Sequence, residues 1–203
     1  SDYEVIGFDI ESNLQDEENV KRIAKENSNA FHLINAFALN DHIQEKDENN
    51  ISALDTPMNI FKEYLDINVT ALYSVCREFV NSRKKGNIIN FSSIYGLVSP
   101  NPSVYEGGRM KSIGYSTSKS AVISLSQYFA AHYSPEFRFN TLAIGGILNN
   151  QNKSFISKYE KQVPIGRMMN LEELMPSIYF LLNPTNTYMT GSILTIDGGY
   201  SII

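Results

Sequence analysis

Cysteine, histidine and tryptophan are scarce in this chain of 203 residues, which has one Cys, three His and no Trp. A single cysteine, Cys76, cannot form an internal disulfide, and such sparing use fits a reducing compartment. Neither CxxC nor HExxH occurs, so these familiar spacings of zinc ligands are missing. We therefore expect no disulfide framework and no metal site.

Positive charge and long apolar runs are also in short supply. The net charge is −5, with 17 Lys and Arg against 22 Asp and Glu, and the pI is about 5.2. This balance argues against nucleic acid as the main partner. No apolar run approaches the roughly 20 residues of a membrane span, and residues 1–11 are unlike a signal peptide. We expect a soluble, cytoplasmic protein that acts on a small molecule and binds no membrane.

What is present is an alternation of strand-like and helix-like segments. A hydrophobic content of 42% suffices for one core, so residues 1–203 are expected to form a single domain. The expected strands are 3–10, 30–34, 87–93, 137–144 and 192–196, and the expected helices are 16–26, 56–83, 115–134 and 171–182. Strands separated by such helices favour an α/β fold with a mainly parallel sheet. Ligands bind such sheets at the carboxyl ends of the strands.

A tyrosine and a lysine on one expected helix are the first candidates for chemistry. Tyr115 and Lys119 are four positions apart and would share a helix face. A neighbouring ammonium lowers the pKa of a phenol from about 10 towards working pH, and such a phenol can exchange a proton with a substrate oxygen. The spacing alone carries little weight, because the Tyr and Lys content gives roughly 0.65 such pairs by chance.

The surrounding motifs strengthen this pair. Asn68 lies in the preceding helix, NFSSIYG (90–96) ends an expected strand, and FNTLAIGGI (139–147) and TGSILTIDGG (190–199) follow. This ordered set resembles the short-chain dehydrogenase/reductase family from roughly residue 9 to the end. The resemblance implies a Rossmann-like, doubly wound parallel sheet. It also implies an NAD(P)(H)-dependent oxidoreductase that interconverts a secondary alcohol and a ketone.

The resemblance implies a role for each matching residue. Tyr115 would be the general acid/base, and Lys119 would lower its pKa and bind the nicotinamide ribose. Ser93 would hold the substrate carbonyl or hydroxyl, with Ser92 as the alternative serine. Asn68 would position Lys119 through a water molecule that begins a proton relay, with a purely structural role as the alternative.

The segment between Ser93 and Tyr115 is longer than in the family pattern, since the two residues are 22 positions apart. Tyr105 lies nearer the usual spacing, but Arg109 follows it at the position of the lysine, so Tyr105 is not expected to be the base. The excess is the segment 100–111, and an insertion beside the site suits a substrate-recognition loop. Arg109 and Lys111 could there bind a phosphate or carboxylate of the substrate, and a solvated loop is the alternative.

Residues near the start of the sequence are candidates for the adenosine end of a cofactor. Asp9, expected to end a strand, would accept hydrogen bonds from the ribose hydroxyls and repel a 2′-phosphate, which favours NAD over NADP. By the family resemblance, Asn13 and Leu14 would contact the adenine.

Two later turns are candidates for the nicotinamide end. Asn35 and Ala36 resemble the family's Asn-Asn-Ala-Gly turn, in which Phe37 replaces a glycine and would narrow the space near the ribose. Gly145 and Ile147 follow the strand at 137–144, in the segment that faces the nicotinamide in the family.

One family feature is missing. A dinucleotide site uses a glycine-rich turn to bind pyrophosphate, but Gly7 is the only glycine before Gly86. We expect the first strand and this turn to belong to a longer chain of which these residues are part. The alternative is a binding or scaffold protein that has lost the cofactor site. A serine hydrolase is disfavoured, because no GxSxG motif occurs.

The resemblance also extends to substrate and assembly. The stretch SSIYGLVSP (92–100), the insertion and Phe37 resemble dehydrogenases of bacterial surface-sugar and flagellin-modification pathways. This implies a sugar or sugar-nucleotide substrate and a role in carbohydrate biosynthesis, with a hydroxysteroid or an acyl-carrier ketone as alternatives. Residues 60–80 and 118–133 correspond to helices that pair subunits in the family, which implies a homodimer or homotetramer; packing within one chain is the alternative.

Overall fold

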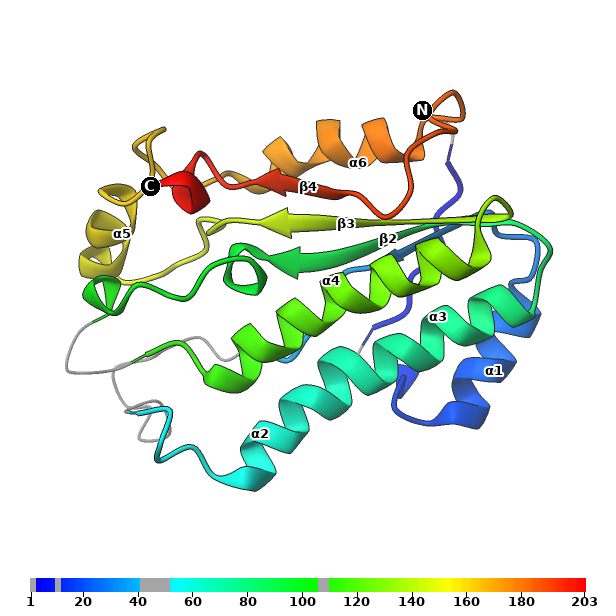
Figure 1. The fold of residues 1–203 in the computed structure, drawn as a ribbon, viewed down its shortest axis with the longest axis horizontal. Helices are drawn as coiled ribbons and strands as arrows, with labels where there is room; N and C mark the ends of the chain where they lie inside the picture. Colours follow the sequence, from blue (N-terminus) through cyan, green and yellow to red (C-terminus); the bar gives the residue numbers. More distant parts are fainter. Residues whose placement is uncertain (1–2, 10–11, 41–51, 106–109) are drawn as a thin grey trace.

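The computed structural model describes residues 3–9, 12–40, 52–105 and 110–203. Within this part of the chain, the sheet has the parallel order β1-β2-β3-β4. The strands are β1 (His32–Asn35), β2 (Gly86–Ser93), β3 (Phe137–Ile144) and β4 (Ile193–Ile196). All four point the same way, so their carboxyl ends meet at one edge (Figure 1). This confirms the expected parallel α/β architecture.

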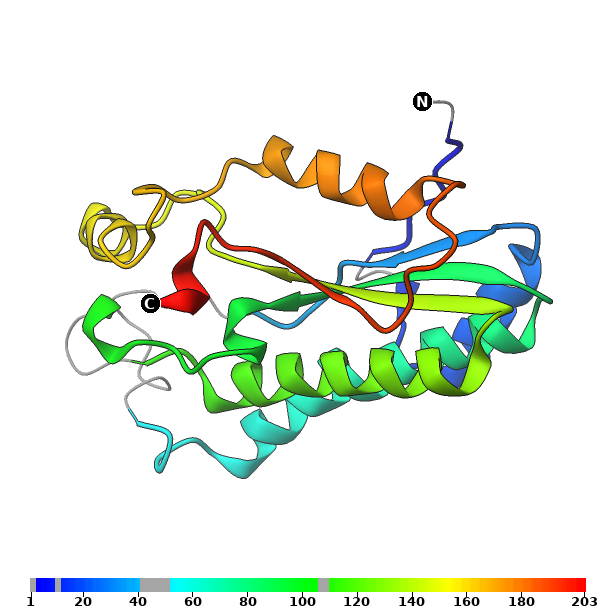
Figure 2. The same ribbon diagram turned by 45° about the horizontal axis from the view of Figure 1, so that its top comes forward.

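Helices cover both faces of the sheet. They are α1 (Glu17–Glu26), α2 (Met58–Leu65), the π-helical turn η3 (Asp66–Ala71), α3 (Leu72–Asn81), α4 (Ile113–Tyr133), α5 (Lys153–Glu160) and α6 (Met175–Leu182). The α3 and α4 helices cover one face with α1 beside α3, α6 covers the other face, and α5 lies beyond the carboxyl ends of the strands (Figures 1 and 2). No helix in the described part of the chain is long and apolar enough to cross a membrane.

Strands β2 and β3 are buried on both faces, and this burial includes the polar residues Asn87, Asn90 and Asn140. Ile88 and Phe139 pack with residues of α3 and α4, whereas Ile89 and Leu142 pack with residues of α6. Successive strand residues point to opposite faces, so the adjacent isoleucines 88 and 89 enter different cores. The helix carrying Tyr115 is therefore fixed firmly against the strand that ends at Ser93.

The expected strand at 3–10 is wrong for the residues that the structure describes. Residues 3–9 form no strand, and Val5 and Ile6 are 84% and 53% exposed. Tyr3 instead meets the His32 ring edge-on, with the ring centroids 5.7 Å apart. A short apolar run becomes a buried strand only beside a partner strand and under covering layers, and the described residues provide no strand that pairs with it.

Two of the expected helices are not α-helical throughout, and one observed helix, α5, was not expected from the sequence. The helix expected at 56–83 is divided by η3, and that expected at 171–182 begins as the 3₁₀ turn η6 (Leu171–Leu174). Helix α5 carries a local signal, because the Asn152 side chain caps it by accepting a hydrogen bond from Phe155 N at 2.7 Å.

Candidate active site

Ser93 ends β2 at the carboxyl edge of the sheet, and the 3₁₀ turn η4 (Ile94–Gly96) follows directly. Its Oγ accepts a hydrogen bond from Tyr95 N at 3.1 Å and is hydrogen-bonded to the Tyr115 side chain. The preceding hydroxyl, that of Ser92, donates to the carbonyl oxygen of Lys119 at 2.7 Å. The structure therefore brings Ser93 to the tyrosine and engages Ser92 with the backbone.

Tyr115 and Lys119 lie one turn apart on α4, and both are buried, at 8% and 5% exposure. The Lys119 ammonium donates to Phe91 O at 2.9 Å and lies 5.8 Å from the centre of the Tyr115 ring. Tyr64 of α2 packs edge-on against this ring, with the centroids 6.4 Å apart. The pair is thus enclosed by the end of β2 and by helix α2.

Burial dominates the electrostatics of this pair. Desolvation raises the pKa of Tyr115, and the hydrogen bond with Ser93 opposes that rise. Desolvation, and then repulsion from the Lys111 ammonium, lower the pKa of Lys119 to about 8. The pKa of Tyr115 is thus raised, whereas the sequence led us to expect that Lys119 would lower it. The reason is that enclosure penalises a phenolate just as it penalises an ammonium.

The π-helical turn η3 carries Asn68, which is 2% exposed. Its Oδ1 accepts from Leu39 N at 2.6 Å, and its Nδ2 donates to Leu39 O at 3.1 Å and to Ser118 Oγ at 2.9 Å. Such turns shift side chains out of α-helical register and occur often at functional sites. Asn68 therefore clamps the segment after β1 to α4, and its water-mediated link to Lys119 stays a prediction.

The residues expected at the adenosine end surround the start of α1. Asp9 ends no strand, contrary to expectation, and its backbone N–H donates to Ser12 Oγ at 3.1 Å. Asn13 is exposed with a positive φ of 43°, and Leu14 is half-buried. Their contacts with a cofactor stay predictions.

The turn after β1 is anchored in the core, and its contacts with a cofactor stay predictions. The Asn35 side chain is buried and donates to Asn90 Oδ1 at 2.8 Å, so it joins β1 to β2 inside the core. Phe37 packs against the core between the sheet and α3–α4. Ala36 between them is exposed.

Gly145 and Gly146 continue β3 beyond the edge of the sheet. A Cβ atom on Gly145 would come within 3.0 Å of Asp197 Cα, and one on Gly146 would come within 2.8 Å of the Tyr159 ring. The Tyr159 hydroxyl accepts a hydrogen bond from Gly146 N at 2.6 Å, and Ile147 forms a bridge with Met169. Sequence reasoning missed Tyr159, since its helical spacing is equally typical of a core residue.

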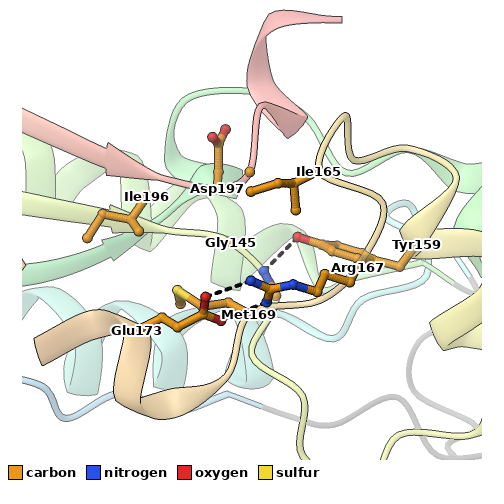
Figure 3. Close-up of a pocket in the computed structure, with 10 residues that line it drawn as sticks. Gly145, Tyr159, Ile165, Arg167, Met169, Glu173, Ile196 and Asp197 are labelled. Atoms are coloured by element: carbon orange, nitrogen blue, oxygen red, sulfur yellow. Dashed lines mark hydrogen bonds and ion pairs between the residues drawn. The ribbon is translucent and has the colours of Figure 1, made fainter.

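A pocket of about 210 Å³ lies beside these glycines (Figure 3). It is lined by Gly145, Gly146, Tyr159, Ile165, Arg167, Met169, Glu173, Ile196, Asp197 and Gly198. Arg167 and Glu173 form a two-bond ion pair at 2.7 and 2.6 Å, which lowers the pKa of Glu173 to about 2. Neither Tyr115 nor Lys119 lines this pocket. The pocket therefore lies at the carboxyl ends of β3 and β4 and does not enclose the acid/base pair.

The insertion before α4 contributes a lysine to the site. The Lys111 ammonium lies 4.4 Å from the centre of the Tyr115 ring and donates to Asn40 Oδ1 at 2.5 Å. Tyr105 donates a hydrogen bond to Tyr95 OH at 3.1 Å, and burial raises its pKa. The expectation that Tyr105 is not the base stays a prediction. Arg109 lies outside the described residues.

The donors of Lys119 indicate which group could bind here. Within the described chain, its ammonium has only the Phe91 carbonyl as a hydrogen-bond acceptor, and no carboxylate pairs with it. An ammonium has three donors, and burial without partners is costly, so the hydroxyls of a nicotinamide ribose fit this position. The pyrophosphate end does not fit equally well, because the described residues hold no glycine-rich turn. They also hold no group of three potential metal ligands.

Known proteins resemble this chain in sequence and in fold. The sequence model of a family described as enoyl-(acyl carrier protein) reductase matches residues 2–201. Post-translational flagellin modification protein A of Campylobacter coli is 32% identical over 177 residues, covering 85% of this chain and 69% of that protein. Glucose 1-dehydrogenase of Gluconobacter oxydans is 28% identical over 200 residues, covering 93% and 70%. A Leptospira borgpetersenii short chain dehydrogenase with bound NAD+ superposes with a TM-score of 0.78 at 27% identity, covering 98% and 80%.

Proposed function

Because the chain belongs to the short-chain dehydrogenase/reductase family, we propose that it interconverts a secondary alcohol and a ketone with Tyr115 as general acid/base. The observation that carries this proposal is the convergence of Ser93, Tyr115 and Lys119 at the carboxyl end of β2. A loss-of-function scaffold has no chemical need of this arrangement, so the enzyme is the better explanation.

Ser93, Tyr115 and Lys119 would have separate roles in the reaction. In the reductive direction, the Tyr115 hydroxyl donates its proton to the carbonyl oxygen while Ser93 donates a hydrogen bond that holds it. In the oxidative direction, the phenolate accepts the proton back from the alcohol. A bound nicotinamide would supply or take up the hydride at the carbon. Burial of Tyr115 excludes water from this exchange.

The nicotinamide end of the cofactor would be held by Tyr115 and Lys119, with the backbone of 145–147 close by. Bound NAD+ in the Leptospira relative supports such a cofactor. Asp9 would select NAD over NADP by repelling a 2′-phosphate. This predicts tighter binding of NADH than of NADPH, and a smaller difference in Asp9→Ser.

A sugar or sugar derivative is the proposed substrate, in a pathway of carbohydrate biosynthesis. The flagellin modification protein and the glucose dehydrogenase support this class by their names. The family description favours a second candidate, a substrate carried on acyl carrier protein. Rates with both kinds of substrate would separate them.

The outer faces of α3 and α4 support assembly into a homodimer or homotetramer. Tyr73, Tyr128 and Tyr133 are 44%, 62% and 41% exposed there, and they line a shallow hollow with Arg77. Exposed aromatic groups of this kind mark contact surfaces. Light scattering of the full chain would give the oligomeric state, and Tyr128→Glu should shift it towards monomer.

The first experiment is titration of the purified full chain with NADH and NADPH, followed by fluorescence or calorimetry. Cofactor oxidation is then assayed with sugar-derived ketones and with acyl-carrier ketones. Tyr115→Phe should lose at least 100-fold in kcat while it keeps NADH binding. Failure to bind either cofactor would instead favour the scaffold.

A further inference from the structure

The Tyr115 ring has two lysine neighbours, and the closer one comes from the insertion. The Lys111 ammonium lies 4.4 Å from the ring centre, against 5.8 Å for Lys119. A cation over an aromatic face is attracted by the negative face of the ring. The attraction becomes a full charge–charge interaction when the hydroxyl ionises.

A chain of hydrogen bonds places this ammonium. Asn68 clamps both backbone groups of Leu39, at 2.6 and 3.1 Å. The next residue, Asn40, accepts a hydrogen bond from Lys111 Nζ at 2.5 Å. Asn68, in the π-helical turn η3, thus fixes the segment that supports Lys111.

Among the residues that the structure describes, the groups beside Tyr115 come from several elements. They are Ser93 at the end of β2, Tyr64 on α2, Tyr105 and Lys111 in the insertion, and Lys119 on α4 itself. Of these, only the two lysines carry charge. The two ammonium groups repel one another, and a phenolate near both would relieve that repulsion.

We propose that Lys111, held by Asn40, is a positioning residue whose ammonium stabilises the phenolate of Tyr115. The effect of Lys111 on catalysis rests on the proposed function. Its effect on the pKa of Tyr115 does not, because ionisation of Tyr115 can be measured without substrate or cofactor. In the enzyme, the second cation offsets part of the cost of burying the acid/base. It therefore moves the useful pH range of Tyr115 downwards.

The test is an NMR titration of the full chain labelled with ¹³Cζ-tyrosine, in which Tyr115→Phe identifies the Tyr115 signal. Lys111→Met should raise the pKa of Tyr115 by about one unit, as expected for losing one nearby charge. Lys111→Arg should keep the pKa of Tyr115 at its value in the natural chain. Asn40→Ala should raise this pKa by less than Lys111→Met does. Lys21→Met, which removes an exposed lysine of α1, is the matched control and should change nothing.

The oxidative reaction gives a second readout, because it needs the phenolate. In Lys111→Met, the midpoint of the rise of kcat with pH should move up by about the same unit. An unchanged Tyr115 pKa and an unchanged midpoint would overturn the proposal. So would a raised KM for an anionic substrate with an unchanged pH profile, which would make Lys111 a substrate contact. A shifted NMR titration in a protein without activity would uphold this inference while the proposed function fails.

Discussion

The hydroxyl of Ser92 donates a 2.7 Å hydrogen bond to the carbonyl oxygen of Lys119, which ties the end of β2 to the helix that carries the acid/base. The next residue, Ser93, contacts Tyr115 on the same helix. The two adjacent serines therefore have different roles: Ser92 anchors α4 to β2, and Ser93 lies at the site.

Substitution of each serine should separate stability from activity. Ser92→Ala should lower the free energy of unfolding by about 1 kcal/mol, because it removes a buried hydrogen bond. Ser93→Ala should leave stability within about 0.5 kcal/mol and reduce kcat at least 10-fold. Urea denaturation and initial rates measure the two effects. The opposite pattern would make Ser92 the substrate-binding serine.

Gly96 is required for the same contact between β2 and α4. A Cβ atom there would come within 2.7 Å of Lys119 O and 2.8 Å of Ser92 Oγ. Gly96→Ala should therefore lower the free energy of unfolding by about 1–3 kcal/mol, the usual range for overpacking. Gly7→Ala is the matched control, since its Cβ would meet nothing within 4 Å. Equal thermal stability of the two variants would contradict this account of the contact.

Burial of Lys119 makes its contribution to stability depend on pH. Its pKa is about 8 in the folded chain against 10.5 for the free group, mainly because of desolvation. Between these values the unfolded chain binds more protons, so this group makes stability rise with pH over that window. Lys119→Met should therefore be more stable than the natural chain at pH 7. That advantage should shrink, by up to about 3 kcal/mol, as the pH rises to 10.5.

Urea denaturation of both proteins at a series of pH values measures this difference. Lys21→Met is the control, because that lysine is exposed on α1. A gap between Lys119→Met and the natural chain that stays constant from pH 7 to 10.5 would contradict the assigned burial of the ammonium. The variant should also bind the cofactor more weakly, which fluorescence titration would show.

Cys76 should react with thiol reagents only when the chain unfolds. It is fully buried, and desolvation raises its pKa to about 12 against the opposing hydrogen bonds of Asn90 and Asn35. Reagents attack the thiolate, so labelling requires opening of the core. The labelling rate should rise with urea in parallel with unfolding, whereas a Ser28→Cys thiol on the surface should react at once. Fast labelling of Cys76 without denaturant would contradict the packing described.

Much of the site could be found in the sequence because its parts have local signatures. Ser93 ends a segment that is expected to be a strand, and Tyr115 and Lys119 have helical spacing. Asp16 likewise marks the start of α1, where its side chain accepts hydrogen bonds from Glu18 N and Asn19 N. Strand period, helix period and capping all depend on neighbours within a few residues, so one sequence suffices to recognise them.

Other features depend on residues distant in sequence. The apolar run at 3–9 looks like a buried strand, but it has no partner strand among the described residues. Asn68 could be named as a site residue, yet its contacts with Leu39 and Ser118 follow from the π-helical turn and from the packing of α4. Lys111 was a candidate for binding a substrate anion, and only the fold shows it over the Tyr115 ring.

Local patterns in the sequence are enough to identify the alternation of strands and helices, the order of the motifs and therefore the family. The tertiary structure alone decided how deeply Tyr115 and Lys119 are buried, and so the direction in which each pKa moves. The physical reason is that a pKa depends on solvent and on charges brought near by packing. Spacing along the chain reports which groups are neighbours on a helix, but not what encloses them.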